Sequence, residues 1–67
     1  MTFRTATDLL AVPLDEVAKA TGRTYGTVLA YRNGVRKAPP EVLEKLAAFM
    51  RKHSADLADA ADDLEAS

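Results

Sequence analysis

The sequence predicts an all-α domain of four helices, the last of which is long. Apolar side chains recur at intervals of three and four residues along most of the chain, and no segment alternates apolar with polar residues as a strand would. Glycine and proline divide this pattern into four segments, with breaks at Pro13, Gly22, Gly34 and the pair Pro39–Pro40. Sixty-seven residues make one small domain at most, and no cysteine is present to stabilise it by a disulfide.

The first helix is expected to begin at the segment Thr5–Asp8, which resembles a capping box with aspartate in place of the usual glutamate. Residues 1–4 would form a loose lead-in. The apolar residues that this helix would carry inward are Leu9, Leu10 and Val12. Pro13 should end the helix, because the residue before a proline is pushed out of the α region, and it also suits the first turn of the helix that follows.

Two short helices, about 14–21 and 24–33, are expected next, joined by a tight turn. Gly22 would end the first helix in the left-handed conformation, Thr24 would cap the second, and Gly34 would end it. Small, turning and apolar residues stand where two crossing helices need them, at Ala18, Gly22, Val28 and Tyr31. This pattern predicts a helix-turn-helix unit whose second helix can enter the major groove of DNA with its N-terminal end.

The fourth helix is expected to run from Pro40 to about Glu65, which is roughly 38 Å at 1.5 Å per residue. One apolar stripe, formed by Val42, Leu46 and Phe49, would pack on the helix-turn-helix unit. A second stripe repeats every seven residues with small residues between, which predicts a homodimer seam formed by Leu43, Ala47, Met50, Ser54, Leu57, Ala61 and Leu64. The same seam could instead pack within one chain if the second half of the helix folded back.

Charged side chains divide the chain into a basic body and an acidic tail. All nine Lys and Arg lie in residues 1–53 against five acids, a balance of +4, whereas residues 54–67 hold the other five acids and no base, a balance of −5. We therefore expect residues 1–53 to form a helix-turn-helix DNA-binding domain and residues 54–67 to form an acidic extension of the last helix. This tail would lie away from DNA, would compete with DNA for the basic face, or would contact a partner protein.

The segment Thr24-Tyr25-Gly26-Thr27-Val28, which follows Val17-Ala18 and Gly22, resembles the helix-turn-helix headpiece of the lac-repressor type. Residues 33–46 also resemble the end of that headpiece and of Cro-like phage repressors, in which a basic turn precedes a helix that packs back on the motif. The likeness covers about residues 14–52. It implies that base edges are reached from Tyr25, Gly26, Leu29 and Ala30. It also implies that the DNA backbone is contacted by Thr24, Thr27, Asn33 and Lys37.

Three of the base-reading positions depart from the pattern of this family. Gly26 has no side chain, and Leu29 and Ala30 cannot make bidentate hydrogen bonds to a base. Direct base contacts are then expected from Tyr25, Thr27 and Arg32. Apolar contacts with thymine methyl groups and the shape of the DNA would add specificity. The full set of candidate DNA-binding residues is Arg23, Thr24, Tyr25, Gly26, Thr27, Leu29, Ala30, Arg32, Asn33, Arg36 and Lys37.

Several polar residues have a simpler interpretation beside the functional one. Tyr25 could cover apolar surface, Arg36 and Lys37 could be solvated charges, and Arg23 could be a phosphate contact or a solvated turn residue. His53 has no second histidine or cysteine to share a metal with, so it is expected to be a surface residue. The aspartates of the tail lack the turning loop of calcium sites and are expected to form a solvated face. We expect no metal and no cofactor.

These features predict a small sequence-specific DNA-binding transcriptional regulator of prokaryotic or phage type. It would bind a palindromic duplex site as a homodimer, with the third helix in the major groove. No sugar-binding domain follows the motif, so no small-molecule effector is expected. The alternative is a protein-interaction module on the same scaffold, such as an assembly or DNA-packaging adaptor. We expect neither an enzyme, since no nucleophile–base set or phosphate loop is present, nor a membrane protein, and we expect a cytoplasmic location.

Overall fold

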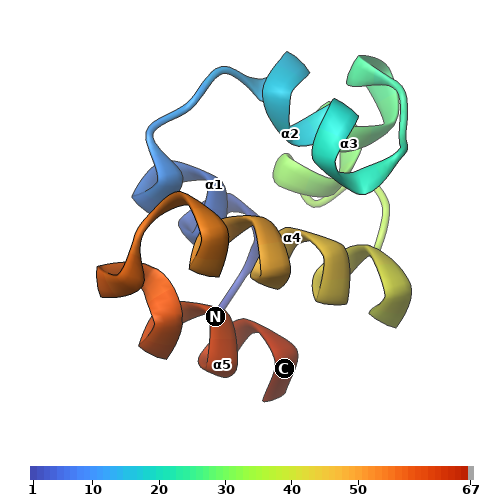
Figure 1. Ribbon diagram of the computed structural model, residues 1–67. Helices are drawn as coiled ribbons and strands as arrows, with labels where there is room; N and C mark the ends of the chain where they lie inside the picture. Colours follow the sequence, from blue (N-terminus) through green and yellow to red (C-terminus); the bar gives the residue numbers. More distant parts are fainter. Residues whose placement is uncertain (67) are drawn as a thin grey trace.

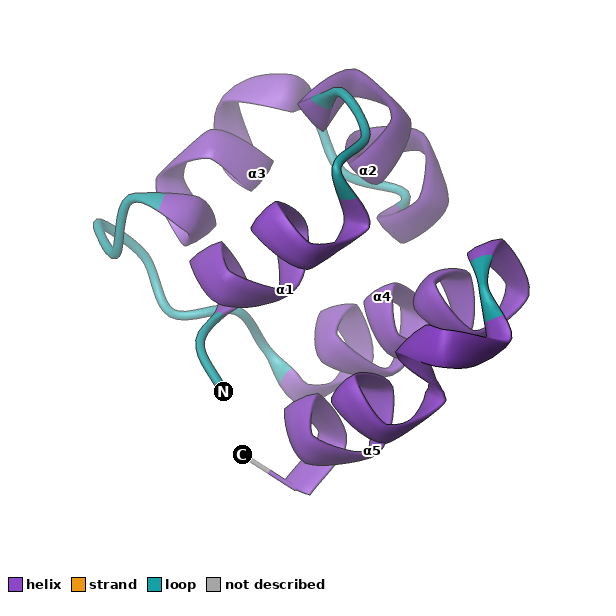
Figure 2. Ribbon diagram, turned by 90° about the vertical axis from the view of Figure 1, so that its left-hand side faces the viewer, coloured by secondary structure: helices purple, strands orange, loops and turns teal. Residues whose placement is uncertain are grey.

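The chain folds into five α-helices with no strand among residues 1–66, which are the residues that this computed structural model describes (Figure 1). The helices are α1 (Phe3–Leu10), α2 (Leu14–Thr21), α3 (Tyr25–Arg32), α4 (Pro40–His53) and α5 (Ala58–Ala66), and a short 3-10 turn, η1 (Ala55–Leu57), precedes the last. The α2–α3 pair lies above α4, and α5 lies below it (Figure 1 and Figure 2). The predicted all-α class is confirmed, whereas the prediction of four helices with a single long C-terminal one is wrong.

Helix α1 begins earlier than predicted, because Thr2 rather than Thr5 is its N-cap. The Thr2 Oγ1 atom accepts a hydrogen bond from the Thr5 N–H over 3.1 Å. A helix that starts there places one buried face at helical spacing, formed by Phe3, Ala6, Thr7 and Leu10. Leu9 falls outside this face and is 48% exposed, so the prediction that it points inward is wrong, while Leu10 is buried as predicted.

The turn between α2 and α3 forms as predicted. Gly22 has a φ of 69°, in the left-handed region, and the N–H of Arg23 donates to the Ala18 carbonyl over 3.0 Å. Thr24 then caps α3, with its Oγ1 accepting a hydrogen bond from the Thr27 N–H over 3.3 Å. Local chemistry therefore fixes both the end of one helix and the start of the next.

Helix α4 ends at His53, and the chain then reverses instead of continuing as a helix to Glu65. Ser54 is extended, with φ −157° and ψ 134°, and its Oγ accepts a hydrogen bond from the Asp56 N–H over 3.2 Å. Helix α5 runs back along α4 from this turn (Figure 1). The longest extent of the Cα trace is 28 Å, which is shorter than the roughly 38 Å of the unbroken helix that the sequence predicted.

The reversal places the predicted dimer seam inside one chain. Its fully buried members are Ala47, Met50, Ala61 and Leu64, and its partly buried members are Leu43, Ser54 and Leu57. The heptad spacing is accounted for by the contact between α4 and α5, because two facing helices of one chain interdigitate in the same way as two helices of a dimer. Homodimerisation itself stays a prediction.

Ion pairs fasten the acidic helix α5 to the rest of the domain. The guanidinium of Arg51 in α4 donates to both carboxylate oxygens of Glu65, at 3.1 and 3.2 Å, and also to Asp62. The hydrogen bonds that Arg51 donates to Glu65 and then to Asp62 raise the pKa of Arg51, and the arginine in turn lowers the pKa of Glu65. The N-terminal ammonium of Met1 lies 3.5 Å from a carboxylate oxygen of Asp63. The predicted acidic tail is thus a structural helix that packs on α4 and α1.

One hydrophobic core joins all five helices. Its buried residues are Phe3, Ala6, Leu10, Val17, Ala18, Val28, Tyr31, Val42, Leu46, Ala47, Met50, Ala61 and Leu64. The predicted burial of Ala18, Val28 and Tyr31 is confirmed, and the ring of Tyr31 meets Phe3 edge-to-face with centroids 5.6 Å apart. The core crosses the predicted boundary between residues 1–53 and 54–67. Ser67, the last residue of the predicted extension, lies outside the described residues.

Candidate functional site

Helix α3 has one buried face and one accessible end. Val28 and Tyr31 are buried against the rest of the domain, whereas Tyr25 is 53% exposed and Gly26 beside it is also exposed. Leu29 and Ala30, farther along the helix, are half-buried. Of the four predicted base-reading positions, only the two at the N-terminal end of α3 are therefore fully available to a partner.

The first turn of α3 is held by two threonine hydroxyls. Thr24 Oγ1 accepts from the Thr27 N–H and donates to Thr27 Oγ1 over 2.9 Å, so both predicted backbone-contacting side chains also close the cap. The N–H groups of Tyr25 and Gly26 belong to the first turn, where a helix has no acceptor of its own for them. Such N–H groups, together with the helix dipole, favour an anion at this end.

The loop that follows α3 carries two exposed basic residues. Gly34 has a φ of 76°, and the Val35 N–H donates to the Ala30 carbonyl over 3.0 Å, which ends α3 in a tight turn as predicted. Three predicted contact residues are exposed on this loop or at its start, namely Asn33, Arg36 and Lys37. The guanidinium of Arg36 lies 5.9 Å from the centroid of the Tyr31 ring, a cation–π contact that restrains it near the helix.

Two other predicted DNA contacts, Arg23 and Arg32, are engaged inside the chain. Arg23 pairs with Glu41 in the first turn of α4, and hydrogen bonding with Tyr31 and then Glu41 raises the pKa of Arg23. Arg32 Nη2 lies 2.8 Å from Asp8 Oδ1 of α1. Both arginines therefore connect α3 and its preceding turn to neighbouring helices, and each has a carboxylate that offsets its charge.

The structure thus brings the candidate residues together in two groups, one at each end of α3. The N-terminal group is Thr24, Tyr25, Gly26 and Thr27, and the C-terminal group is Asn33, Arg36 and Lys37. The five helical residues 28–32 lie between the groups, and α3 as a whole, with eight residues, is roughly 12 Å long. An anionic partner in contact with both groups would meet backbone N–H groups at one end and two cationic side chains at the other.

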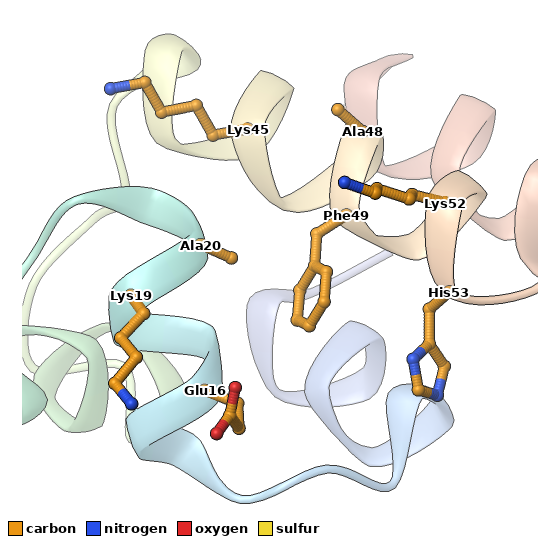
Figure 3. Close-up of a pocket in the computed structure, with 8 residues that line it drawn as sticks. All are labelled: Glu16, Lys19, Ala20, Lys45, Ala48, Phe49, Lys52 and His53. Carbon is orange, nitrogen blue, oxygen red and sulfur yellow. The ribbon is translucent and has the colours of Figure 1, made fainter.

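Sequence reasoning missed a groove between α2 and α4 (Figure 3). Its lining residues are Glu16, Lys19, Ala20, Lys45, Ala48, Phe49, Lys52 and His53. Lys45 Nζ lies 3.9 Å from the position that a Cβ on Gly22 would occupy, so one end of the groove reaches the α2–α3 turn. The spacing of Lys45, Phe49 and Lys52 on one helical face is the signal that could have revealed it.

The described part of the chain shows neither a metal-binding cluster nor a membrane-spanning helix. Within residues 1–66, no three His, Asp or Glu side chains lie where they could hold a metal ion. No helix in that range is both long enough and apolar enough to cross a bilayer. No protein-family model, no curated protein and no solved structure matches this chain.

Proposed function

We propose that this protein binds duplex DNA, with α2 and α3 acting as a helix-turn-helix and the N-terminal end of α3 in the major groove. The observation that carries the proposal is the exposure of Tyr25 and Gly26 at the end of a helix whose opposite face is buried. A recognition helix needs this combination, because it must be held rigidly by the core while its first turn meets base edges. The protein would act as a small regulator of prokaryotic or phage type.

Direct base contacts are few in this arrangement. Tyr25 is the one large side chain at the exposed end of α3, while Arg32 is turned toward Asp8 and Gly26 offers only backbone. Exposed Arg36 and Lys37 suit phosphates on the flanking backbone. The affinity would therefore come mainly from phosphate contacts, and the specificity from Tyr25 together with DNA shape.

Selection of bound sites from a pool of random duplexes tests this function directly. We expect an enriched motif, and a palindromic motif would show that two copies bind together, through a surface other than the buried α4–α5 contact. Tyr25→Ala should weaken binding to the selected site by about 1–3 kcal/mol. Lys37→Ala should reduce the magnitude of the slope of log affinity against log salt concentration by about one. Lys52→Ala, on the far turn of α4, is the control. Absence of any enriched motif, with affinity insensitive to salt, would overturn the proposal.

The second candidate is a protein-interaction adaptor on the same scaffold. Two observations favour it: Arg23 and Arg32 are paired within the chain, and Gly26 presents no side chain where a base would be read. A surface that recognises a protein needs fewer unpaired cationic side chains than a surface that binds phosphates. In this case Tyr25→Ala would remove binding to the partner protein, and duplex DNA would show no salt-dependent binding.

A further inference from the structure

The groove between α2 and α4 has the form of a docking site distinct from the exposed end of α3. Its volume is about 740 Å³, and two facing helical stripes form its walls. The α2 stripe is Glu16, Lys19 and Ala20, and the α4 stripe is Lys45, Ala48, Phe49, Lys52 and His53. Figure 3 shows the Phe49 ring directed into the space between the two helices.

Small residues line both walls of the groove, since Ala20 on α2 and Ala48 on α4 carry only a methyl group. The ring of Phe49 packs against the core but stays half-buried, so part of it is open to the groove. His53 meets Phe49 edge-to-face, with ring centroids 5.9 Å apart, and closes one end. The floor is therefore apolar, and an apolar group placed there would remove the ring of Phe49 from water.

The rim of the groove is strongly cationic. Three of its eight lining residues are lysines and one is a glutamate, a balance of +2 with His53 neutral. Across the part of the chain that the structure describes, none of Lys19, Lys45 and Lys52 takes part in an ion pair, whereas Arg23, Arg32 and Arg51 each do. The groove thus combines an apolar floor with uncompensated positive charge.

We propose that this groove binds an acidic amphipathic helix of a partner protein. Lys45 and Lys52 are seven residues apart on α4, or roughly 10 Å, which is two helical turns. A partner helix with carboxylates seven residues apart, and with an apolar residue between them on the same face, would pair with both lysines and cover Phe49. Lys19 on the opposite wall would meet a third carboxylate.

Other occupants fit the groove less well. A DNA backbone offers phosphates to the lysines but no apolar group to cover Phe49. The acidic α5 helix of a second copy offers carboxylates, but the large exposed apolar side chains of the described chain are Leu9, Tyr25 and Val35, none of which lies on α5. A partner helix that supplies both chemistries is the occupant that the groove favours.

A designed peptide tests the proposal without knowledge of the natural partner. The probe is an alanine-based helix of about 16 residues, with glutamates seven positions apart and leucines at the third and fourth positions between them. Binding is followed by fluorescence anisotropy and by amide chemical shifts of the full-length protein. We expect saturable binding, with the largest shifts in α2 and the second half of α4. A peptide with glutamine in place of glutamate should not bind.

Two protein variants test separately the contributions of charge and of apolar contact to peptide binding. Lys19→Glu with Lys52→Glu should weaken peptide binding by about tenfold or more, which corresponds to two lost ion pairs. Ala48→Leu changes no charge but fills the hollow, and it should also weaken binding. Arg4→Glu makes the same kind of charge change at an exposed site outside the groove and should leave binding unchanged.

Three results would overturn the proposal. The first is no binding of the peptide, and the second is equal weakening by Arg4→Glu, which would indicate general charge attraction. The third is loss of duplex DNA affinity in the Lys19→Glu and Lys52→Glu protein without peptide binding by the unaltered chain, which would assign the groove to phosphates. Because Tyr25→Ala tests the DNA surface separately, failure of either proposal leaves the other to be judged by its own measurements.

Discussion

Two chain reversals in this molecule, at Gly22 and at Ser54, join helices by different chemistry. The α2–α3 turn uses a left-handed glycine, with φ 69°, to end one helix. The α4–α5 turn uses an extended serine, whose hydroxyl accepts a hydrogen bond from the Asp56 N–H and so starts the next helical segment. The first kind of turn can be predicted from the residue type, because glycine adopts that φ at least cost. The second kind of turn cannot be predicted in this way, because serine also occurs within helices.

The two helix pairs also differ in what they do with their polar surface. The α2–α3 pair leaves Tyr25 and Gly26 exposed, and the adjoining loop leaves Arg36 and Lys37 exposed. The contact between α4 and α5 is instead held by ion pairs, those of Arg51 with Asp62 and Glu65. We conclude that the contact between α4 and α5 mainly completes the core, whereas the proposed binding surfaces lie at α3 and between α2 and α4. This division of labour can be tested by substitutions in each pair.

The largest effect is expected from Leu64→Ala in α5. Leu64 is fully buried in the common core, so its truncation should lower the free energy of unfolding by about 3 kcal/mol. That is a large part of the stability of so small a domain. Urea denaturation followed by circular dichroism measures it, with Leu9→Ala as a control at an exposed leucine, where a change within about 0.5 kcal/mol is expected. A small effect at Leu64 would mean that α5 is not docked.

The next effect concerns the glycine turn. Gly22→Ala should lower the free energy of unfolding by about 1–2 kcal/mol, because alanine is strained at φ 69° although the nearest atom leaves room for its methyl group. Gly26→Ala is the matched control. A Cβ there would meet nothing within 4 Å in a helical position, so this change should raise stability by about 1 kcal/mol. Thermal unfolding measures the midpoint temperature of both variants. Shifts of the same sign at Gly22 and Gly26 would contradict this role of the left-handed glycine.

A smaller effect is expected at the serine turn. Ser54→Ala removes the acceptor of the Asp56 N–H and should lower stability by about 0.5–1 kcal/mol. The mass in solution should stay unchanged, as measured by sedimentation. An increase in helix content with a doubled mass would instead show that α4 and α5 had merged into the long dimerising helix that the heptad spacing suggested.

The smallest effect is a pH dependence carried by Glu65. Arg51 lowers the pKa of this carboxyl, so the stabilisation from the pair is present above the ordinary glutamate pKa of about 4.3 and is lost as pH falls through the lower folded value. Glu65→Gln should therefore be slightly less stable than the parent at neutral pH and equal to it near pH 2. A constant difference at every pH would exclude this role of the pair.

Local chemistry made part of the fold predictable. Gly22, Thr24 and Gly34 each have a strong conformational or capping preference, and the structure confirms the helix ends that they imply. Ser54 was not predicted as a break, because the leucines and small residues keep their helical period on both sides of it. Ala11 ends α1 with φ 55°, and its residue type does not indicate a helix end either, since alanine is the best helix former.

The candidate site was predictable only in its backbone. The position of α3, its caps and its buried face follow from nearby residues, but the partners of its arginines do not. Arg23 pairs with a residue 18 positions away and Arg32 with one 24 positions away, and such pairs depend on how the helices pack. The groove between α2 and α4 was missed for the same reason, because its lysines come from two helices that are separate in the sequence.

The placement of α5 has an electrical consequence for the whole molecule. Residues 1–53 carry a balance of +4 and residues 54–67 one of −5, and α5 and α3 lie on opposite sides of the domain (Figure 1 and Figure 2). A body of this kind has a large dipole moment but almost no net charge. Near a charged polymer, the electric field exerts a torque on the dipole but only a small net force on the molecule. This effect acts within a screening distance of about 8 Å in physiological salt. If the chain binds DNA as proposed, α5 would turn the molecule so that α3 faces the DNA, and its negative charge would limit attraction to polyanions in general.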